Sequence, residues 1–346
     1  MFFLNNCDKD KISDWINQWN SEQSSFDFFT SGSTGIPKTI SISRNQLTTS
    51  AKLTLNTLNL QKGDSMLINL NTDFIAGKMM LIRGIIGEMD IYITEPSSNP
   101  LLDLNPDQHF DFLSFVPIQI ETILTKTPEK ITILNKAKAI IIGGAPISNQ
   151  LHGLIQAIEV PVFHTYGMTE TVSHIALKRL NGEHQSEYFE TLKGITISTD
   201  NRNCLVVNHD ITNHQNIVTN DVIELISDSK FKWLGRADDI INSGGIKLLP
   251  NQIELKINSI FELLNLNNKF FIFGLPHQKL GTSINLLIEE NEAFNSEKLA
   301  SLESHLKNNL TKYELPKKIY FKDKFVETPT LKIDKKQTIH SLGIEH

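Results

Sequence analysis

The feature that most constrains the fold is a series of short apolar segments, each bounded by glycine, proline or polar residues. Segments of this kind predict strands that are buried on both faces of a sheet. Helical patterns alternate with them, and the clearest begins at Ser43, where Ser43 and Gln46 have the spacing of a capping box. Alternating strands and helices predict an α/β architecture. The strands predicted in this part are 65–70, 90–94, 110–116, 139–142 and 160–164.

The pattern changes after Asn201, where shorter segments with alternating polarity appear. There the sequence predicts strands at 204–207, 222–226, 270–273 and 283–288 and helices at 250–260 and 297–309. We therefore predict two domains. The first is a large α/β domain with mixed sheets over residues 1–237, and the second is a small, mobile α+β domain over residues 238–346.

The composition argues against several classes of protein. A formal net charge of −6 over 346 residues is unlike the basic face of most nucleic-acid-binding proteins. No apolar run reaches the roughly 18 residues of a membrane span, and charges begin too early for a signal peptide. Cys7 and Cys204 form no CxxC pair, which is typical of a reducing compartment. We expect a cytoplasmic protein with small-molecule partners.

The strongest local signal is the segment 30–38, with the sequence TSGSTGIPK. Small residues let backbone N–H groups approach an anion, and hydroxyl groups and an ammonium add further donors. The segment is no Walker loop, because Pro37 separates the glycine from the lysine. A flexible linker has a similar composition, but a linker needs no fixed cation. We interpret the segment as a polyphosphate site formed by Thr30, Ser31, Gly32, Ser33, Thr34, Gly35 and Lys38.

Further motifs follow along the chain. The segment 141–146 (IIGGAP) carries a glycine pair that lets a flat ring lie against backbone. The segment 165–171 (TYGMTET) offers the ring of Tyr166 for stacking and the carboxylate of Glu170 for Mg²⁺. Asp221 carries a carboxylate, whose two oxygens can accept two hydrogen bonds at once. Taken alone, an ordinary turn is the better interpretation of the segment 165–171, and the isolated Asp221 is a weak signal.

In this order the motifs resemble those of the acyl-adenylate-forming (AMP-binding) enzymes, over residues 28–334. The resemblance implies ATP, Mg²⁺ and coenzyme A as co-substrate. It implies that Lys332 is the catalytic lysine, that Thr169 and Glu170 address phosphate and Mg²⁺, and that Asp238 is a hinge between the domains. It also implies nucleotide contacts by the segment 30–38 and by Gly144, Ala145, Pro146, Thr165, Tyr166, Gly167, Asp221 and Arg236, and a passage for the pantetheine arm at Gly244 and Gly245.

The sequence departs from the family pattern at several places. Asn220 and Leu331 stand where the family has glycine, and Lys335 and Lys336 are neighbouring alternatives to Lys332. Few residues precede the phosphate segment, so the chain resembles a version shortened at its N-terminus. Because of these departures, an alternative function remains open. The chain could be a degenerate nucleotide-binding regulator, which would bind nucleotide without releasing pyrophosphate.

Two segments narrow the expected acid. The run 169–175 (TETVSHI) is similar to the TETASQI run of o-succinylbenzoate–CoA ligases of menaquinone biosynthesis. The segment 74–83 is similar to a stretch of those enzymes that begins with His-Ile-Ser-Gly and continues as an apolar helix ending in arginine, and Phe74 replaces its histidine. We expect Lys78 or Arg83 to bind a second carboxylate, although a surface position is favoured for Arg83. Ala76 and Gly77 would leave room for a flat ring. The acid-binding residues predicted are Ala76, Gly77, Lys78, Gly143 and Ser173. Another aryl- or acyl-CoA ligase, or an enzyme that loads a carrier-protein thiol, remains an alternative.

Overall fold

The structure is a computed structural model that describes residues 1–4, 8–29, 39–290, 294–327 and 333–343. The chain divides into two compact units, and each is described by itself. Unit 1 contains residues 1–200, 206–219 and 225–232, and unit 2 contains residues 201–205, 220–224 and 233–346. The domain boundary predicted after residue 237 stays a prediction.

A large mixed sheet organises the N-terminal part of the chain. Among the described residues it has the strand order β1-β5-β4-β6-β7-β8-β9-β10-β14-β13-β12-β11. Neighbours from β1 to β8 in this order are parallel, whereas β8, β9, β10 and β14 pair antiparallel. The prediction of an α/β fold with mixed sheets is therefore confirmed. The strands are β1 (Phe2–Phe3), β4 (Ser65–Ile68), β5 (Asp90–Ile93), β6 (Phe112–Phe115), β7 (Ala139–Ile142), β8 (Val162–Gly167), β9 (His174–Arg179), β10 (Phe189–Thr191), β11 (Thr196–Thr199), β12 (Cys204–Asn208), β13 (Ile217–Ser227) and β14 (Lys230–Arg236).

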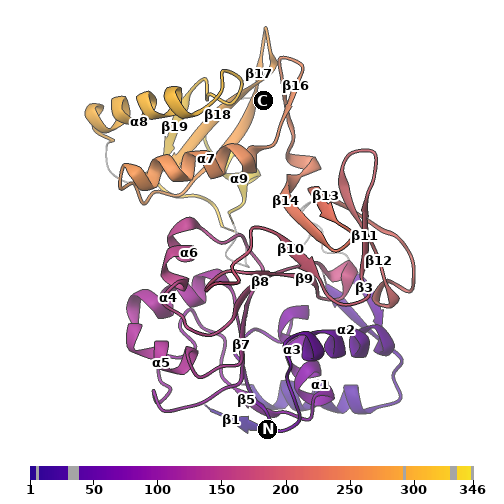
Figure 1. Ribbon diagram of the computed structural model, residues 1–346. Coiled ribbons are helices and arrows are strands. Elements are labelled where there is room, and N and C mark those ends of the chain that lie inside the picture. The colour runs from indigo at the N-terminus through magenta and orange to yellow at the C-terminus, as the bar shows by residue number, and fades with distance from the viewer. Residues whose placement is uncertain (5–7, 30–38, 291–293, 328–332, 344–346) are drawn as a thin grey trace. The chain divides into compact units, whose positions relative to one another are not determined.

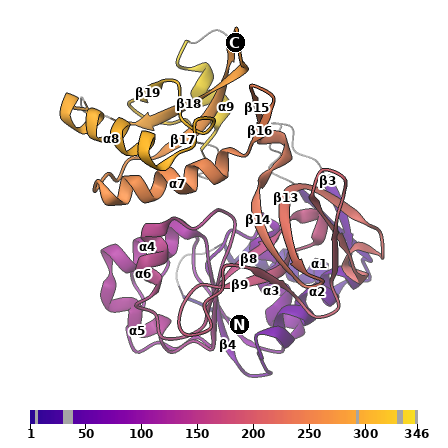
Figure 2. The same ribbon diagram turned by 45° about the horizontal axis from the view of Figure 1, so that its top comes forward.

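Helices cover both faces of the parallel strands, with α4, α5 and α6 on one face and α1, α2 and α3 on the other (Figures 1 and 2). A continuous apolar core joins α4 and α6 to β6, β7 and β8 through residues such as Ile120, Leu151 and Ile140. On the other face α2 packs against α3. The helices are α1 (Lys9–Asn20), α2 (Arg44–Thr57), α3 (Ile75–Ile86), α4 (Pro117–Lys126), α5 (Ile131–Leu134) and α6 (Asn149–Ile155).

The predicted start of α2 is confirmed in atomic detail. The Ser43 side chain accepts a hydrogen bond from the backbone N–H of Gln46 at 3.2 Å, and the Gln46 side chain accepts one from the Ser43 N–H at 3.0 Å. Each bond satisfies a donor that a helix start would otherwise leave unpaired. A separate two-stranded sheet precedes this helix, formed by β2 (Ser25–Phe29) and β3 (Thr39–Ser43).

Unit 2 contains a smaller sheet in the order β16-β15-β18-β17, with β19 paired to β18. The helices α7 and α8 bury Ile257 and Leu302 in a core with Leu286 of β18. A second cluster around Phe271 and Phe325 forms a separate core with Leu287. The elements are β15 (Ile241–Ser243), β16 (Ile246–Leu248), α7 (Pro250–Leu263), β17 (Phe270–His277), β18 (Gly281–Glu289), α8 (Ser296–Asn309), β19 (Ile319–Lys322) and α9 (Lys335–His340).

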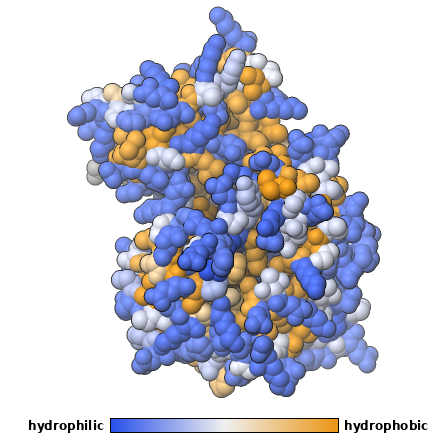
Figure 3. Space-filling view, viewed as in Figure 1, coloured by the Kyte–Doolittle hydropathy of each residue, from blue (hydrophilic) through white to orange (hydrophobic). Residues whose placement is uncertain are grey.

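The face seen in Figure 3 is covered mainly by hydrophilic residues, which small hydrophobic patches interrupt. In the part of the chain that the structure describes, no helix is both long and apolar enough to cross a bilayer.

Candidate functional site

The carboxyl ends of β7 and β8 bring two of the predicted motifs together. These strands are parallel neighbours with Ile142 opposite His164, so the segments after them lie at one edge of the sheet. Gly143 has no room for a side chain, because a Cβ atom there would lie 2.3 Å from Oγ1 of Thr165. The Thr165 hydroxyl donates to the Ile142 carbonyl at 3.3 Å. The glycine pair at 143–144 therefore lies beside the motif that begins at Thr165.

Tyr166 rests on two phenylalanines that the sequence patterns did not select. Its ring centroid lies 5.1 Å from that of Phe231, at an interplanar angle of 78°, and 5.7 Å from that of Phe189. Phe189 and Phe231 are paired across β10 and β14, and their rings stack at 5.5 Å. Because Tyr166 is only partly buried, these contacts fix its ring while part of it stays accessible to a planar ligand.

His164 links β8 to the segment that follows β7. Its Nε2 atom lies 3.2 Å from the carbonyl oxygen of Ala145. Burial, together with the charge of nearby Lys178, lowers the pKa of His164 to about 4. The ring is therefore neutral at pH 7, and Nε2–H donates to the carbonyl. Nδ1 is buried without a hydrogen-bond partner among the described residues. The sequence analysis missed this residue, whose only signal is its place two positions before Tyr166.

A tight turn carries Thr169 and Glu170. In it the Thr171 hydroxyl oxygen accepts from the Met168 N–H at 3.0 Å. Val172 follows with φ of 66°, a strained conformation for a β-branched residue. The turn leaves Glu170 exposed, whereas Ser173 is partly buried. The strain therefore lies at the point where the chain turns between two predicted site residues.

Metal binding at this turn rests on Glu170. Within the described ranges no group of three or more His, Cys, Asp and Glu residues could hold a metal ion. A single carboxylate nevertheless fits Mg²⁺, which commonly takes one or two protein carboxylates and completes its shell with water and substrate phosphates. The role of Glu170 as a metal ligand stays a prediction.

The position expected for Arg83 is wrong, because its side chain is buried in unit 1, with 2% of the residue exposed. Its Nη2 donates to Oγ of Ser173 at 2.6 Å. Burial lowers the pKa of Arg83 to about 9, so the guanidinium remains charged at pH 7. In the described part of the chain no carboxylate pairs with it, and its Nε is buried without a hydrogen-bond partner. The structure thus brings a buried cation to a predicted acid-binding residue.

His174 and Thr54 lie next to this cation. Nε2 of His174 is 3.1 Å from Oγ1 of Thr54, and both side chains are buried. Burial lowers the pKa of His174 well below its usual value, and the charge of Arg83 lowers it further. The histidine is therefore neutral at pH 7, so it adds a polar contact without adding a second positive charge.

The interpretation of Gly77 is also wrong. A Cβ atom at this position would lie 2.4 Å from the carbonyl oxygen of Asn71, so the free space expected for a flat ring is filled by backbone. The glycine instead permits α3 to pack closely on the preceding loop. Ala76 is exposed, and Lys78 is half-buried. With 3.6 residues per turn, Lys78 and Arg83 point about 140° apart around α3, so the two cations address different surroundings.

In unit 2, three predicted residues gather at the end of β14. Asp221 is buried and accepts a hydrogen bond from the indole N–H of Trp233 at 3.1 Å. Arg236 lies 3.8 Å from the same carboxylate and forms a closer pair with Asp238 at 2.9 Å. Asn220 also donates to Asp238, at 3.2 Å. The carboxylate of Asp221 is thus held by an indole and a guanidinium, and the hinge role of Asp238 stays a prediction.

The remaining residues of unit 2 lie in the β15–β16 hairpin or near the C-terminus. Gly244 and Gly245 form the turn with φ of 59° and 83°, a conformation that favours glycine. Lys335, the neighbouring alternative to Lys332, is engaged with Glu254 at 2.9 Å. Eight predicted site residues are not described. They are Lys332 and, in the phosphate segment, Thr30, Ser31, Gly32, Ser33, Thr34, Gly35 and Lys38, which all lie outside the described residues.

The described strands nevertheless bracket the phosphate segment. Phe29, the last residue of β2, pairs with Thr39, the first residue of β3. The described residues that flank the segment 30–38 are therefore neighbours in one antiparallel ladder.

Comparison with known proteins relates the chain to one family. The family described as AMP-binding enzyme matches residues 6–218. A solved acyl-CoA synthetase (AMP-forming)/AMP-acid ligase II-like protein from Dyadobacter fermentans is 39% identical, with a TM-score of 0.65 over 98% of this chain and 95% of that chain.

Two further relatives are named for a particular acid. A 2-succinylbenzoate–CoA ligase of Oceanobacillus iheyensis is 24% identical over 317 residues, which cover 84% of this chain and 64% of that protein. The chain therefore spans a little under two thirds of that relative. An O-succinylbenzoate coenzyme A synthetase of Bacillus subtilis, solved with ATP and magnesium ion, is 21% identical with a TM-score of 0.72, over 90% of this chain and 69% of that chain. At this identity the likeness shows the fold.

Proposed function

Because this chain belongs to the AMP-binding enzyme family, we propose that it is an ATP-dependent acid–thiol ligase. In the first step a carboxylate oxygen attacks the α-phosphorus of ATP, which forms an acyl-AMP and releases pyrophosphate. In the second step the thiol of coenzyme A attacks the acyl carbon, which forms the thioester and releases AMP and a proton.

Adenylation requires cations and oriented donors rather than an acid–base pair, because negative charge develops on phosphate. The segment 30–38 and Lys332 would supply these donors. Tyr166 would stack on adenine, and its contacts with Phe189 and Phe231 support this role by fixing the ring.

Asp221 is proposed to accept hydrogen bonds from the ribose hydroxyls. Its support is the pairing with Trp233 and Arg236, which holds the carboxylate in one orientation. Mg²⁺, when bound at Glu170, would neutralise charge on the departing pyrophosphate. In the second step the thiol would approach along Gly244 and Gly245 after a rotation about Asp238, which would also withdraw Lys332.

The acid is proposed to be o-succinylbenzoate, as in menaquinone biosynthesis, and the observation that carries this choice is the buried pair of Arg83 and Ser173. A buried guanidinium without a carboxylate partner costs free energy. An anion that binds close to the guanidinium would offset this cost. Because the Ser173 oxygen accepts from Arg83, its O–H is left to donate outward. The pair would therefore select an acid with a second carboxylate.

A panel of acids tests the proposal. Pyrophosphate release would be measured for o-succinylbenzoate, for its two analogues that each lack one carboxyl group, and for unrelated aryl and alkyl acids. The product would then be analysed with coenzyme A and with a carrier protein as acceptor. We expect the highest kcat/KM with o-succinylbenzoate and coenzyme A. Turnover of another acid with no signal for o-succinylbenzoate would reject o-succinylbenzoate as the substrate. Nucleotide binding without pyrophosphate release from ATP in the presence of any acid would favour the alternative of a degenerate nucleotide-binding regulator.

A further inference from the structure

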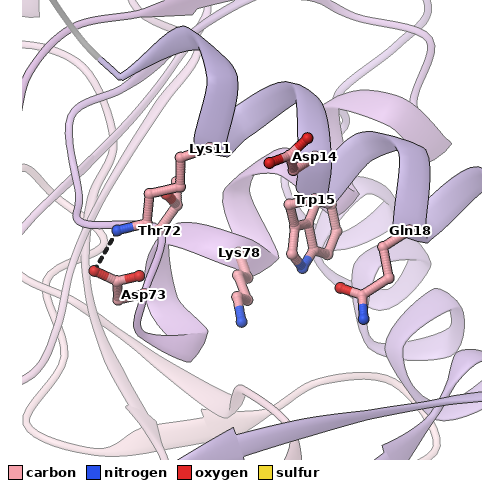
Figure 4. A pocket seen from close by; sticks show the side chains of 7 residues that line it. All are labelled: Lys11, Asp14, Trp15, Gln18, Thr72, Asp73 and Lys78. Carbon is pink, nitrogen blue, oxygen red and sulfur yellow. Dashed lines mark hydrogen bonds and ion pairs between the residues drawn. The ribbon is translucent and has the colours of Figure 1, made fainter.

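Unit 1 contains a cavity whose lining includes none of the residues discussed above except Lys78. It has a volume of about 370 Å³ and lies between α1, the loop before α3 and the first turn of α3. A cavity of this size can hold a small molecule. Figure 4 shows its lining, which includes Lys11, Asp14, Trp15 and Gln18 of α1 together with Asp73 and Lys78.

The wall that α1 contributes is rigid and regular. Residues 11, 14, 15 and 18 follow the i, i+3, i+4, i+7 spacing of a helix face. The helix is held by buried Trp15 and Trp19, whose rings stack at 5.7 Å, and Trp19 stacks on Phe26 of β2 at 5.3 Å. The Asp8 side chain accepts from the Lys11 N–H at 3.0 Å and caps the helix start. The lining is therefore in place without a ligand.

The two lysines of the cavity differ in their partners. Lys11 forms an ion pair with Asp73. Nζ of Lys78 lies over the ring of Phe28, 5.2 Å from its centroid, and no carboxylate pairs with it in the part of the chain that the structure describes. Burial removes part of the hydration of this ammonium and lowers the pKa of Lys78, while the charge of Asp73 raises it and that of Lys11 lowers it. A partly desolvated cation without a direct ion pair favours an anionic partner.

Neutral donors face the same side as this cation. In Figure 4 the indole nitrogen of Trp15 and the ammonium of Lys78 point into the same open space, and the amide of Gln18 lies next to them. The three groups can all donate hydrogen bonds. Their arrangement suits an anion that accepts several hydrogen bonds at once, as a carboxylate does.

The charges of the wall decide between anions. Two lysines and two aspartates leave the lining without net charge, so it has no excess positive charge to neutralise a phosphate dianion, which would be left with twice the uncompensated charge of a monoanion. The ring of Trp15 adds an apolar surface. From the geometry we propose that this cavity binds a small monoanionic carboxylate with an aryl or alkyl body, through Lys78, Trp15 and Gln18.

The site is distinct from the pair of Arg83 and Ser173, because Lys78 and Arg83 point about 140° apart around α3. The inference therefore does not rest on the proposed ligase activity. It also assigns a role to the N-terminal helix α1, which otherwise contributes no residue to the candidate site described above.

Binding of fluorobenzoate to the full chain, followed by fluorine NMR, tests the proposal, with inorganic phosphate as the competing probe. Lys78→Gln is expected to weaken binding about tenfold and Gln18→Ala about two- to fivefold. Asp14→Asn is expected to strengthen binding about twofold, because it removes a repelling charge. A gain of affinity cannot come from misfolding, which protects the test against unstable variants.

Two matched variants locate the bound molecule. Lys52→Gln changes an exposed lysine of α2, and Ser173→Ala changes the proposed acid site, so both are expected to leave fluorobenzoate binding at Lys78 unchanged. The proposal is overturned if no carboxylate binds, if Lys78→Gln has no effect, or if Ser173→Ala abolishes the signal. Phosphate binding that is tighter than carboxylate binding and is lost in Lys78→Gln would overturn the assigned ligand class.

Discussion

Replacement of Arg83 by methionine is expected to raise stability and lower activity at the same time. Arg83 is buried, has no carboxylate partner among the described residues and leaves Nε without a hydrogen bond. Methionine fills a similar volume without charge. Replacing buried charges by apolar residues is often neutral or stabilising by about 1–4 kcal/mol, and the lost bond to Ser173 offsets about 1 kcal/mol of this. We therefore expect the free energy of unfolding to be unchanged or to rise by up to about 3 kcal/mol.

The effect on catalysis is expected to have the opposite sign. Methionine removes the buried positive charge that would attract the second carboxylate of the bound acid, and interactions of this kind with a charged group contribute about 1.5–3 kcal/mol. Loss of this energy would lower kcat/KM for o-succinylbenzoate about 10- to 100-fold. Acids without a second carboxylate would lose less than about twofold, since they make no use of the cation.

Two measurements check this reasoning. Urea unfolding, followed by the fluorescence of Trp15 and Trp19, reports on the stability of unit 1. Pyrophosphate release with the matched acids reports on recognition, and Ser173→Ala should reproduce the catalytic loss without the gain in stability. Equal losses for acids with and without a second carboxylate would refute the proposed role. A fall in unfolding free energy of several kcal/mol would show that Arg83 acts as a structural residue instead.

The remaining predictions concern packing, protonation and the catalytic lysine. Gly77→Ala is expected to cost about 1–3 kcal/mol, because its Cβ would lie 2.4 Å from a carbonyl oxygen, whereas Gly153→Ala in α6 meets nothing within 4 Å and should be neutral or stabilising in the same urea assay. His164 has a folded pKa of about 4, below its usual 6.5, so the unfolded chain binds the proton first. Stability should therefore fall by at most about 3 kcal/mol as the pH drops from 6.5 to 4, and an unchanged slope in His164→Gln would argue against this assignment. Lys332→Ala should slow acyl-AMP formation about 100-fold or more but leave thioester formation from premade acyl-AMP nearly intact, and equal loss in both half-reactions would contradict its role.

Local patterns in the sequence determined most of the secondary structure. The predicted strand 139–142 coincides with β7, and the capping box at Ser43 marks the start of α2. Such features depend on residues a few positions apart, so their physical causes are contained in one stretch of chain. For the same reason the motif order predicted the family, since the motifs follow one another along the chain whatever their positions in space.

Only the tertiary structure decided what surrounds each site residue. The sequence placed Arg83 at the surface and assigned free space to Gly77, and both were wrong, because the burial of α3 depends on α2, the sheet and the loop at Asn71. Phe189, which supports Tyr166, lies on another strand that becomes a neighbour only when the sheet forms. Burial, desolvation and packing are properties of contacts between distant segments, and local periodicity carries no information on which segments meet.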